Sequence, residues 1–144
     1  MKKLIFIICL LVPFLIHAQS DGFLSGIDEF LTYFVSDGYT IVDHGGNNTN
    51  TNQVIYPKTS KFDASVKYSL IVLVDDCYSC PLSVRFIYKD GSSAKIKMKI
   101  KRNNGLTVAQ YHFREKTPIE GEFEIQVDSK NDYYTYMVLV SKNE

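Results

Sequence analysis

The sequence predicts a mainly β protein, an antiparallel β-sandwich with one N-terminal amphipathic α-helix. Three observations support this fold class. Short runs of alternating apolar and polar residues recur along the chain, separated by turn signals such as Asp90-Gly91 and Asn104-Gly105. Tyrosine and phenylalanine, which favour strands, contribute 10 and 9 of the 144 residues. No helical crossover separates the strand-like runs, as a parallel sheet would require.

Residues 1–18 have the features of a signal peptide. A positively charged start precedes an apolar run from Leu4 to Ile16, and Ala18 supplies a small residue for cleavage. The run is shorter than the roughly 20 residues that cross a bilayer. Cys9 offers the alternative of a lipid tether, but bulky residues precede it. We therefore expect a bacterial protein that is periplasmic or secreted, with no membrane span after signal cleavage.

The remaining chain has the length of one domain. Without the two lysines of the leader, the 16 basic residues fall to 14 against 16 acidic residues, a net charge of −2. This balance gives no electrostatic reason to expect nucleic acid as a partner. We expect residues 19–61 to form a helix, short strands and a polar loop packed on the sandwich, and residues 62–144 to form the β-sandwich core.

Phe23–Val35 is the one convincing helix. Its apolar residues recur at three- and four-residue steps: Phe23, Leu24, Ile27, Phe30, Leu31, Phe34 and Val35. Gly38 stands where a left-handed C-cap would end the helix. The polar face lacks the cations of a membrane-surface helix, so we expect the stripe to pack on the sheet.

After the helix, the sequence predicts a short strand at residues 39–43, a mobile polar loop at residues 45–52 and an extended segment at residues 53–56.

Two central strands are joined by a loop that carries both cysteines outside the leader. Tyr68–Val74 is apolar on both faces, which indicates a strand buried on both sides. Leu82–Tyr88 alternates as a half-buried strand does. The same reasoning predicts four later strands: Ala94–Lys101, Leu106–Arg114, Glu122–Asp128 and Tyr133–Val140.

Four segments carry a resemblance to a known family. They are Tyr68–Asp76, Leu82–Tyr88 with Asp90-Gly91, Gly121–Val127 and Tyr136–Val140. From Phe62 to Val140 the chain resembles bacterial pre-peptidase C-terminal (PPC-like) domains, jelly-roll-like sandwiches that accompany secreted peptidases and also occur alone. Where that family commonly has an Asp-Leu-Asp run, this chain has Cys80–Ser83, so the resemblance carries over no calcium role. It implies a stand-alone accessory or binding domain.

Cys77 and Cys80 have the spacing of a thiol-disulfide redox motif. In such enzymes a helix N-terminus lowers the pKa of the first thiol, whereas the residues after Cys80 alternate like a strand. We therefore predict a structural disulfide, as exported proteins commonly contain; a redox-active pair, metal ligands and free thiols are the alternatives. A zinc site would need two further ligands, and neither His44 nor His112 has ligand spacing to the cysteines.

Carboxylates that flank the two central strands form a candidate cation site: Asp75, Asp76 and Asp90. Calcium takes six or more oxygen ligands, of which these supply a few. Solvated strand ends are the alternative interpretation.

Two further groups are candidate ligand surfaces. The first is the lysine row of residues 94–101, suited to an acidic polysaccharide: Lys95, Lys97, Lys99 and Lys101. Its alternative is a solvated face neutralised by Glu122, Glu124 and Asp128. The second is a tyrosine group that offers rings for stacking on sugars, or packs in the core: Tyr133, Tyr134 and Tyr136.

The sequence contains no glycine-framed serine elbow and no motif that sets a base beside a nucleophile. We therefore predict no catalytic residues, no cofactor, no metal and no enzymatic activity. The leading hypothesis is a non-enzymatic exported binding or accessory module of the bacterial cell envelope, with a protein or a glycan as its partner. The alternatives are a thiol-disulfide oxidoreductase using Cys77 and Cys80, and a carbohydrate-binding or adhesin-like module.

Overall fold

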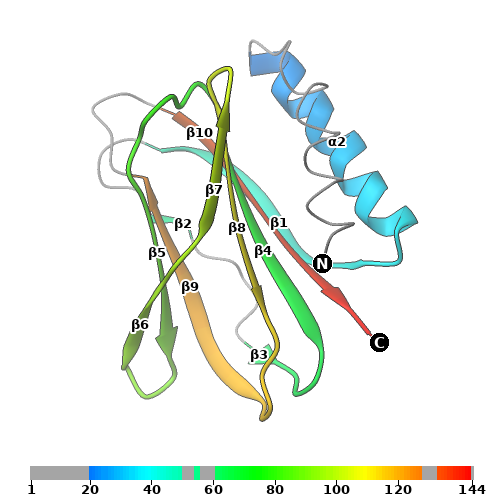
Figure 1. Cartoon of the computed structure of the whole chain (residues 1–144), viewed down its shortest axis with the longest axis vertical. Coiled ribbons are helices and arrows are strands. Elements are labelled where there is room, and N and C mark those ends of the chain that lie inside the picture. The colour runs from blue at the N-terminus through cyan, green and yellow to red at the C-terminus, as the bar shows by residue number, and fades with distance from the viewer. Residues whose placement is uncertain (1–19, 50–53, 56–60, 128–132, 144) are drawn as a thin grey trace.

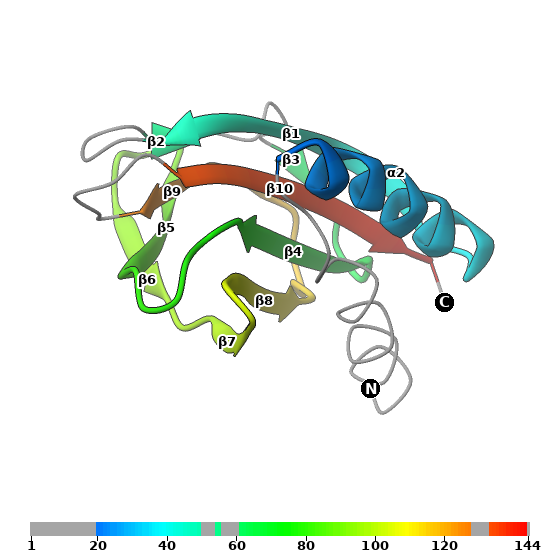
Figure 2. The ribbon, with the colours of Figure 1, turned by 90° about the horizontal axis from the view of Figure 1, so that it is seen from above.

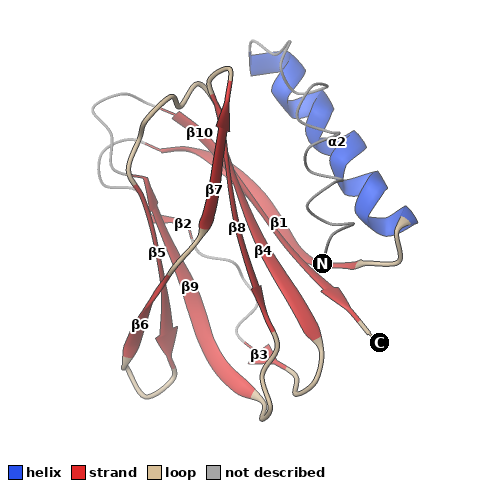
Figure 3. Cartoon of the chain, viewed as in Figure 1, coloured by secondary structure: helices blue, strands red, loops and turns tan. Residues whose placement is uncertain are grey.

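The computed structural model describes residues 20–49, 54–55, 61–127 and 133–143. The predicted signal peptide lies outside these ranges. Two antiparallel sheets face each other, and one helix lies on the outer side of one sheet (Figures 1 and 2). Strands make up most of the described residues, as Figure 3 shows by colour. The predicted β-sandwich with one helix is confirmed. Within the described ranges, no helix combines the length and the apolar character that a membrane span requires.

The sheet that faces the helix, here called the helix-side sheet, has the strand order β1-β10-β4-β8-β7. The bounds of its strands are β1 Thr40–Thr49, β10 Tyr133–Lys142, β4 Lys67–Val74, β8 Leu106–Phe113 and β7 Lys99–Asn103. As predicted, β4 is buried on both faces: Leu70 and Ile71, which point in opposite directions, are both fully buried. This central strand therefore contributes to two separate apolar clusters.

The opposite sheet has the order β2-β9-β5-β6, and β3 also pairs with β9. Its strands are β2 Val54–Ile55, β9 Ile119–Val127, β5 Leu82–Tyr88, β6 Ser93–Ile96 and β3 Lys61–Phe62. The alternation predicted for β5 is confirmed, because Val84 and Phe86 are buried while Arg85 is exposed. β9 alternates in the same way along most of its length.

Aromatic rings fill much of the space between the two sheets. The ring of Phe62 is completely enclosed and lies 5.2–5.8 Å, centroid to centroid, from four others: Tyr68, Phe86, Phe113 and Phe123. These contacts are edge-on, a favourable geometry for aromatic pairs. β3 has only two residues, and this ring anchors it in the core between the sheets.

Helix α2 (Ser20–Ser36) covers part of the outer face of the helix-side sheet. Its buried residues are Phe23, Ile27, Phe30 and Phe34, and they pack on a sheet surface made by Ile71, Leu73, Leu106, Val108, Tyr136, Val138 and Val140. The predicted packing is thereby confirmed. Leu31 is partly buried beside them, and the side chain of Leu24 lies outside the described part of the structure. Val35 instead has 57% of its surface exposed, because it lies about 100° around the helix from Phe34.

The helix ends as predicted. Gly38 has a φ of +79°, and its N–H donates to the carbonyl of Val35 at 3.1 Å. The N–H of Tyr39 donates to the carbonyl of Phe34 at 3.0 Å. These two bonds form a Schellman motif, in which glycine adopts the left-handed conformation without steric cost.

The mobile loop predicted for residues 45–52 is wrong for its described part. Residues 45–49 continue β1 and pair with β10, while residues 50–52 lie outside the described ranges. The ring of Tyr136, on the partner strand, lies directly against Gly46, which it faces in register. An aromatic ring over a cross-strand glycine compensates for the missing side chain. The sandwich therefore begins at Thr40, whereas the sequence placed only residues 62–144 in its core.

The single strand predicted for residues 94–101 is also wrong. Its first half is β6 in the opposite sheet and its second half begins β7 in the helix-side sheet, with Lys97 and Met98 between them. Alternation continues through the crossing because both halves turn apolar residues towards the same core. Ile100 is paired with the buried Ala109 and lies on the inner face, yet it is 39% exposed because β7 is an edge strand.

Gly46→Ala should lower the free energy of unfolding by about 1–3 kcal/mol, the cost of overpacking a tight contact. An added Cβ would lie 2.5 Å from Cδ2 of Tyr136 and 3.0 Å from the carbonyl oxygen of Thr135. Gly45→Ala is the matched control, because a Cβ at that neighbouring position meets nothing within 4 Å. Urea denaturation of both variants measures the difference, and equal stabilities would contradict the proposed packing of β1.

Candidate functional site

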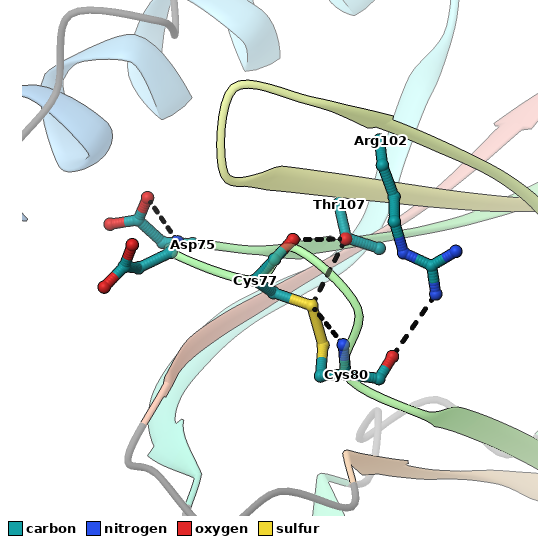
Figure 4. Close-up of a disulfide and its surroundings, with 6 residues drawn as sticks. Asp75, Cys77, Cys80, Arg102 and Thr107 are labelled. Carbon is teal, nitrogen blue, oxygen red and sulfur yellow. Dashed lines mark hydrogen bonds between the residues drawn. A yellow bond between two sulfur atoms is a disulfide. The ribbon is translucent and has the colours of Figure 1, made fainter.

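The loop between β4 and β5, residues 75–81, connects the two sheets at one end of the sandwich and is called here the cysteine loop. Figure 4 shows its disulfide, formed by Cys77 and Cys80 with a Cα–Cα distance of 5.7 Å. The predicted disulfide is present. Strand β5 begins at Leu82, so the segment that follows Cys80 is extended and supplies no helix N-terminus.

Hydrogen bonds tie the cysteine loop to β7 and to the start of β8 (Figure 4). The N–H of Cys77 donates to the carbonyl of Gly105, and the carbonyl of Cys77 accepts from the Oγ1 of Thr107 at 2.8 Å. The guanidinium of Arg102 reaches the carbonyl of Cys80, with an Nη2–O distance of 3.3 Å. Three positions outside the loop therefore fix its backbone.

The disulfide is enclosed by protein. Cys77 has no exposed surface and Cys80 has 5%. The Sγ of Cys77 accepts a hydrogen bond from the N–H of Cys80 at 3.2 Å, and the Oγ1 of Thr107, which donates its proton to the Cys77 carbonyl, also lies 3.2 Å from this sulfur. Thiol-disulfide exchange requires a thiolate to reach a sulfur, which this burial obstructs. The arrangement favours a structural disulfide over a redox-active pair.

Tyr78 is a large exposed side chain at the tip of the cysteine loop, with 69% of its surface accessible. Part of its ring lies over Gly105, where an added Cβ would come within 3.2 Å of Cζ and Oη. Gly105 also has a φ of +86°, so both its backbone and this contact favour glycine. Sequence analysis did not single out Tyr78, although an aromatic residue between two paired cysteines was a usable signal.

The three carboxylates of the candidate cation site do not converge. Asp75 and Asp76 follow β4 in the cysteine loop, whereas Asp90 lies in the turn at the far end of β5. Burial raises the pKa of Asp75. Asp90 instead accepts hydrogen bonds from the Oγ and N–H of Ser92, which lower its pKa. Among the described residues, no three acidic, histidine or cysteine side chains are grouped to hold a metal ion.

The predicted lysine row is divided between the two outer faces of the sandwich. Lys95 on β6 is paired with the outward-facing Arg85 of the opposite sheet. Lys101 on β7 is paired with Val108, which packs under helix α2, so Lys99 and Lys101 lie on the outer face of the helix-side sheet. A single flat stripe of four lysines is therefore not formed.

The acidic residues of β9 pair mainly with cations outside that row. Glu120 lies 2.6 Å from the Nζ of Lys89 and 3.9 Å from that of Lys61. Glu124 forms an ion pair with Arg85. Of these two residues only Glu124 belongs to the predicted acidic row, and the cation it pairs with here, Arg85, lies outside the lysine row. Asp128, the last member of the acidic row, lies outside the described residues.

The three tyrosines of the candidate sugar-stacking surface contribute to the two cores. Tyr136 is buried, and its hydroxyl lies 2.6 Å from Nδ1 of His44. Tyr134 packs edge-on against Phe23 of the helix at 5.7 Å. Tyr133 packs against the core between the sheets. The rings face opposite sides of β10 and form no common exposed platform.

Strands β4 and β8 bring together a further polar pair that sequence analysis missed. Ser69 and His112 are register partners, and the Oγ of Ser69 lies 2.7 Å from Nδ1 of His112. Burial lowers the pKa of His112 below its usual value of 6.5, and the charge of Lys99 lowers it further. The two residues are 43 positions apart in the sequence, and no local motif indicates that they are in contact.

No protein-family model matches the chain, and no curated protein matches it. Among solved structures, it is similar to the N-terminal CBM22-1–GH10 modules of endo-1,4-β-D-xylanase 10B (Xyn10B) from Clostridium thermocellum, a structure complexed with xylohexaose. The TM-score is 0.40 at 16% identity, over 75% of this chain and 26% of the xylanase chain. The match thus spans about a quarter of that protein and carries no argument about function.

We expect the disulfide to be inert in the folded protein. Incubation with reduced glutathione should release no thiol detectable by maleimide labelling until denaturant is added, because both sulfurs are buried. An insulin-reduction assay should likewise show no activity above the glutathione background. Rapid labelling of the native protein, or catalysed insulin reduction, would instead support the oxidoreductase alternative.

Proposed function

We propose that this protein is an exported, non-enzymatic binding module of the bacterial cell envelope and that it contacts its partner through the cysteine loop. The observation that carries the proposal is Tyr78, a largely exposed aromatic side chain on a backbone fixed by a disulfide and by hydrogen bonds. The partner is a protein or a glycan of the envelope. Export rests on the signal peptide predicted for residues 1–18.

A tyrosine on an ordered loop can bind a partner at a low cost in conformational entropy. Tyrosine offers a large contact area with few rotatable bonds, and tyrosine is enriched among the residues that dominate binding energy. A loop that is already ordered loses little conformational freedom when a partner docks. The cysteine loop is already ordered before binding. Its disulfide and its hydrogen bonds to Gly105, Thr107 and Arg102 hold its backbone in place.

Charged side chains flank the disulfide of the cysteine loop and suit the rim of a recognition surface. Asp75 and Asp76 precede the disulfide, and Asp76 is exposed. Arg102 lies on the other side, with its guanidinium directed at the carbonyl of Cys80 (Figure 4). An exposed tyrosine on a loop that is flanked by charged groups is compatible with a protein interface, in which aromatic residues are enriched and the rim is polar.

Two alternatives receive less support from the structure. An oxidoreductase needs an accessible sulfur activated by its surroundings, whereas this disulfide is buried and a strand follows it. A carbohydrate-binding module using the tyrosines of β10 needs exposed rings, whereas these rings pack in the cores. The accessory role implied by the resemblance to PPC-like domains agrees with our proposal, and membership of that family stays a prediction.

Tyr78→Ala should weaken binding to the envelope partner by about 2 kcal/mol, roughly thirtyfold in Kd, as truncation of an interface anchor does. The partner is first selected by screening the immobilised protein against a glycan array and against solubilised envelope proteins. Affinities are then measured by calorimetry.

Tyr88→Ala is the matched control for this experiment, because Tyr88 is also exposed but lies at the other end of β5. It should bind as the wild type does. A Tyr78→Ala variant with unchanged affinity would contradict the proposal, as would a wild-type protein that retains no glycan and no envelope protein.

A further inference from the structure

A second polar surface lies on the outer face of the helix-side sheet, where four side chains form what we call the donor patch: Ser69, Lys99, Gln110 and His112. The strand register brings them together. On adjacent strands, Ser69 is paired with His112 and Lys99 with Gln110, while Gln110 and His112 are two positions apart on β8 and share one face. Facing side chains on neighbouring strands have Cβ atoms about 4.5–5.5 Å apart, so the four groups are close neighbours.

Gln110 is the residue of the donor patch that most directly indicates a missing ligand. Only 7% of its surface is exposed, and its Nε2 has no hydrogen-bond partner among the described residues. A buried donor without a partner is energetically costly, and such groups are rare in folded proteins. An acceptor brought by a ligand would satisfy this donor.

The charged residues of the surrounding strands favour an acceptor that carries negative charge. The four adjacent strands β10, β4, β8 and β7 contain no aspartate and no glutamate. The register places Lys67, Lys99, Lys101 and Lys142 on the outer face, where Lys142 is already paired with Asp37. Arg102 lies on the inner face, towards Cys80. Lys99 itself is exposed, and its charge already acts on His112. A negatively charged group is therefore favoured on this face over a neutral or positive one.

His112 can supply a second hydrogen-bond donor to the same ligand. When the Ser69 hydroxyl donates to Nδ1 across their 2.7 Å contact, the neutral ring carries its proton on Nε2. Ser69 is buried, whereas His112 retains an exposed surface. The imidazole can then donate from Nε2 to a ligand, while Ser69 acts as a positioning residue.

We propose that the donor patch binds an oxyanion group, such as a carboxylate, sulfate or phosphate, carried by a soluble ligand or by an acidic glycan. Lys99 supplies the charge, and Gln110 Nε2 and His112 Nε2 donate hydrogen bonds to the oxygens. This site is separate from the cysteine loop. It goes beyond the proposed function, and either of the two proposals can fail without the other.

The test is an NMR titration of isotope-labelled protein purified from an exporting host, at constant ionic strength. One arm adds inorganic phosphate and the other adds tetragalacturonate, so that a free anion and an acidic glycan are distinguished. We expect saturable shifts of the Gln110 side-chain amide and of the His112 ring signals in at least one arm. Absence of saturable shifts at these groups in both arms would overturn the proposal.

Two lysine variants test the site's specificity. Lys99→Gln should weaken the anion's affinity tenfold or more, as expected for loss of a charge-assisted hydrogen bond. Lys95→Gln removes the same charge from the opposite sheet and should leave the affinity unchanged. Because both lysines are exposed, both variants should fold. Equal weakening by the two substitutions would indicate a general charge effect and would overturn the assignment.

Discussion

Burial of the helix-side sheet on both of its faces is the constraint on which the rest of the structure depends. Leu70 and Leu73 of β4 point to opposite sides, and neither has any exposed surface. One side packs on the aromatic core between the sheets, and the other packs under helix α2. An apolar sheet face of this size is rarely left open to water, so the fold requires the helix. Phe34 is the most completely buried residue of the helix stripe.

Both proposed surfaces depend on that doubly covered sheet. The cysteine loop leaves the end of β4 and is fastened to Thr107, near the start of β8. The donor patch lies further along the same strand, at Gln110 and His112. β8 therefore holds both surfaces in position. The loop offers an exposed ring and is flanked by charges of both signs, while the patch offers donors and positive charge, so the two suit different ligands.

The sequence was informative wherever structure follows from local chemistry. The helix stripe, its glycine cap, the alternation of β5 and the Cys77–Cys80 pairing each involve residues close together in the chain, and all were predicted. Val35 was included in the stripe because its hydrophobicity suggested burial, although the geometry of α2 turns it outward.

The errors arose where a distant strand decides the outcome. Gly46 belongs to a strand because Tyr136, far along the chain, covers it. The segment 94–101 is divided because its halves pair with different sheets, which alternation cannot reveal. The contact between Ser69 and His112 likewise exists only through the β4–β8 register. Tyr78 was overlooked for another reason, since its exposure depends on how the disulfide and Gly105 shape the loop.

The most direct test of this account compares the stabilities of two variants at adjacent helix positions. By chemical denaturation, Phe34→Ala should lose about 3–5 kcal/mol of unfolding free energy, the typical cost of removing a buried phenylalanine. Val35→Ala should change it by less than about 0.5 kcal/mol, as expected for an exposed site. A Phe34→Ala variant as stable as Val35→Ala would show that the helix does not support the sheet, and would contradict the account.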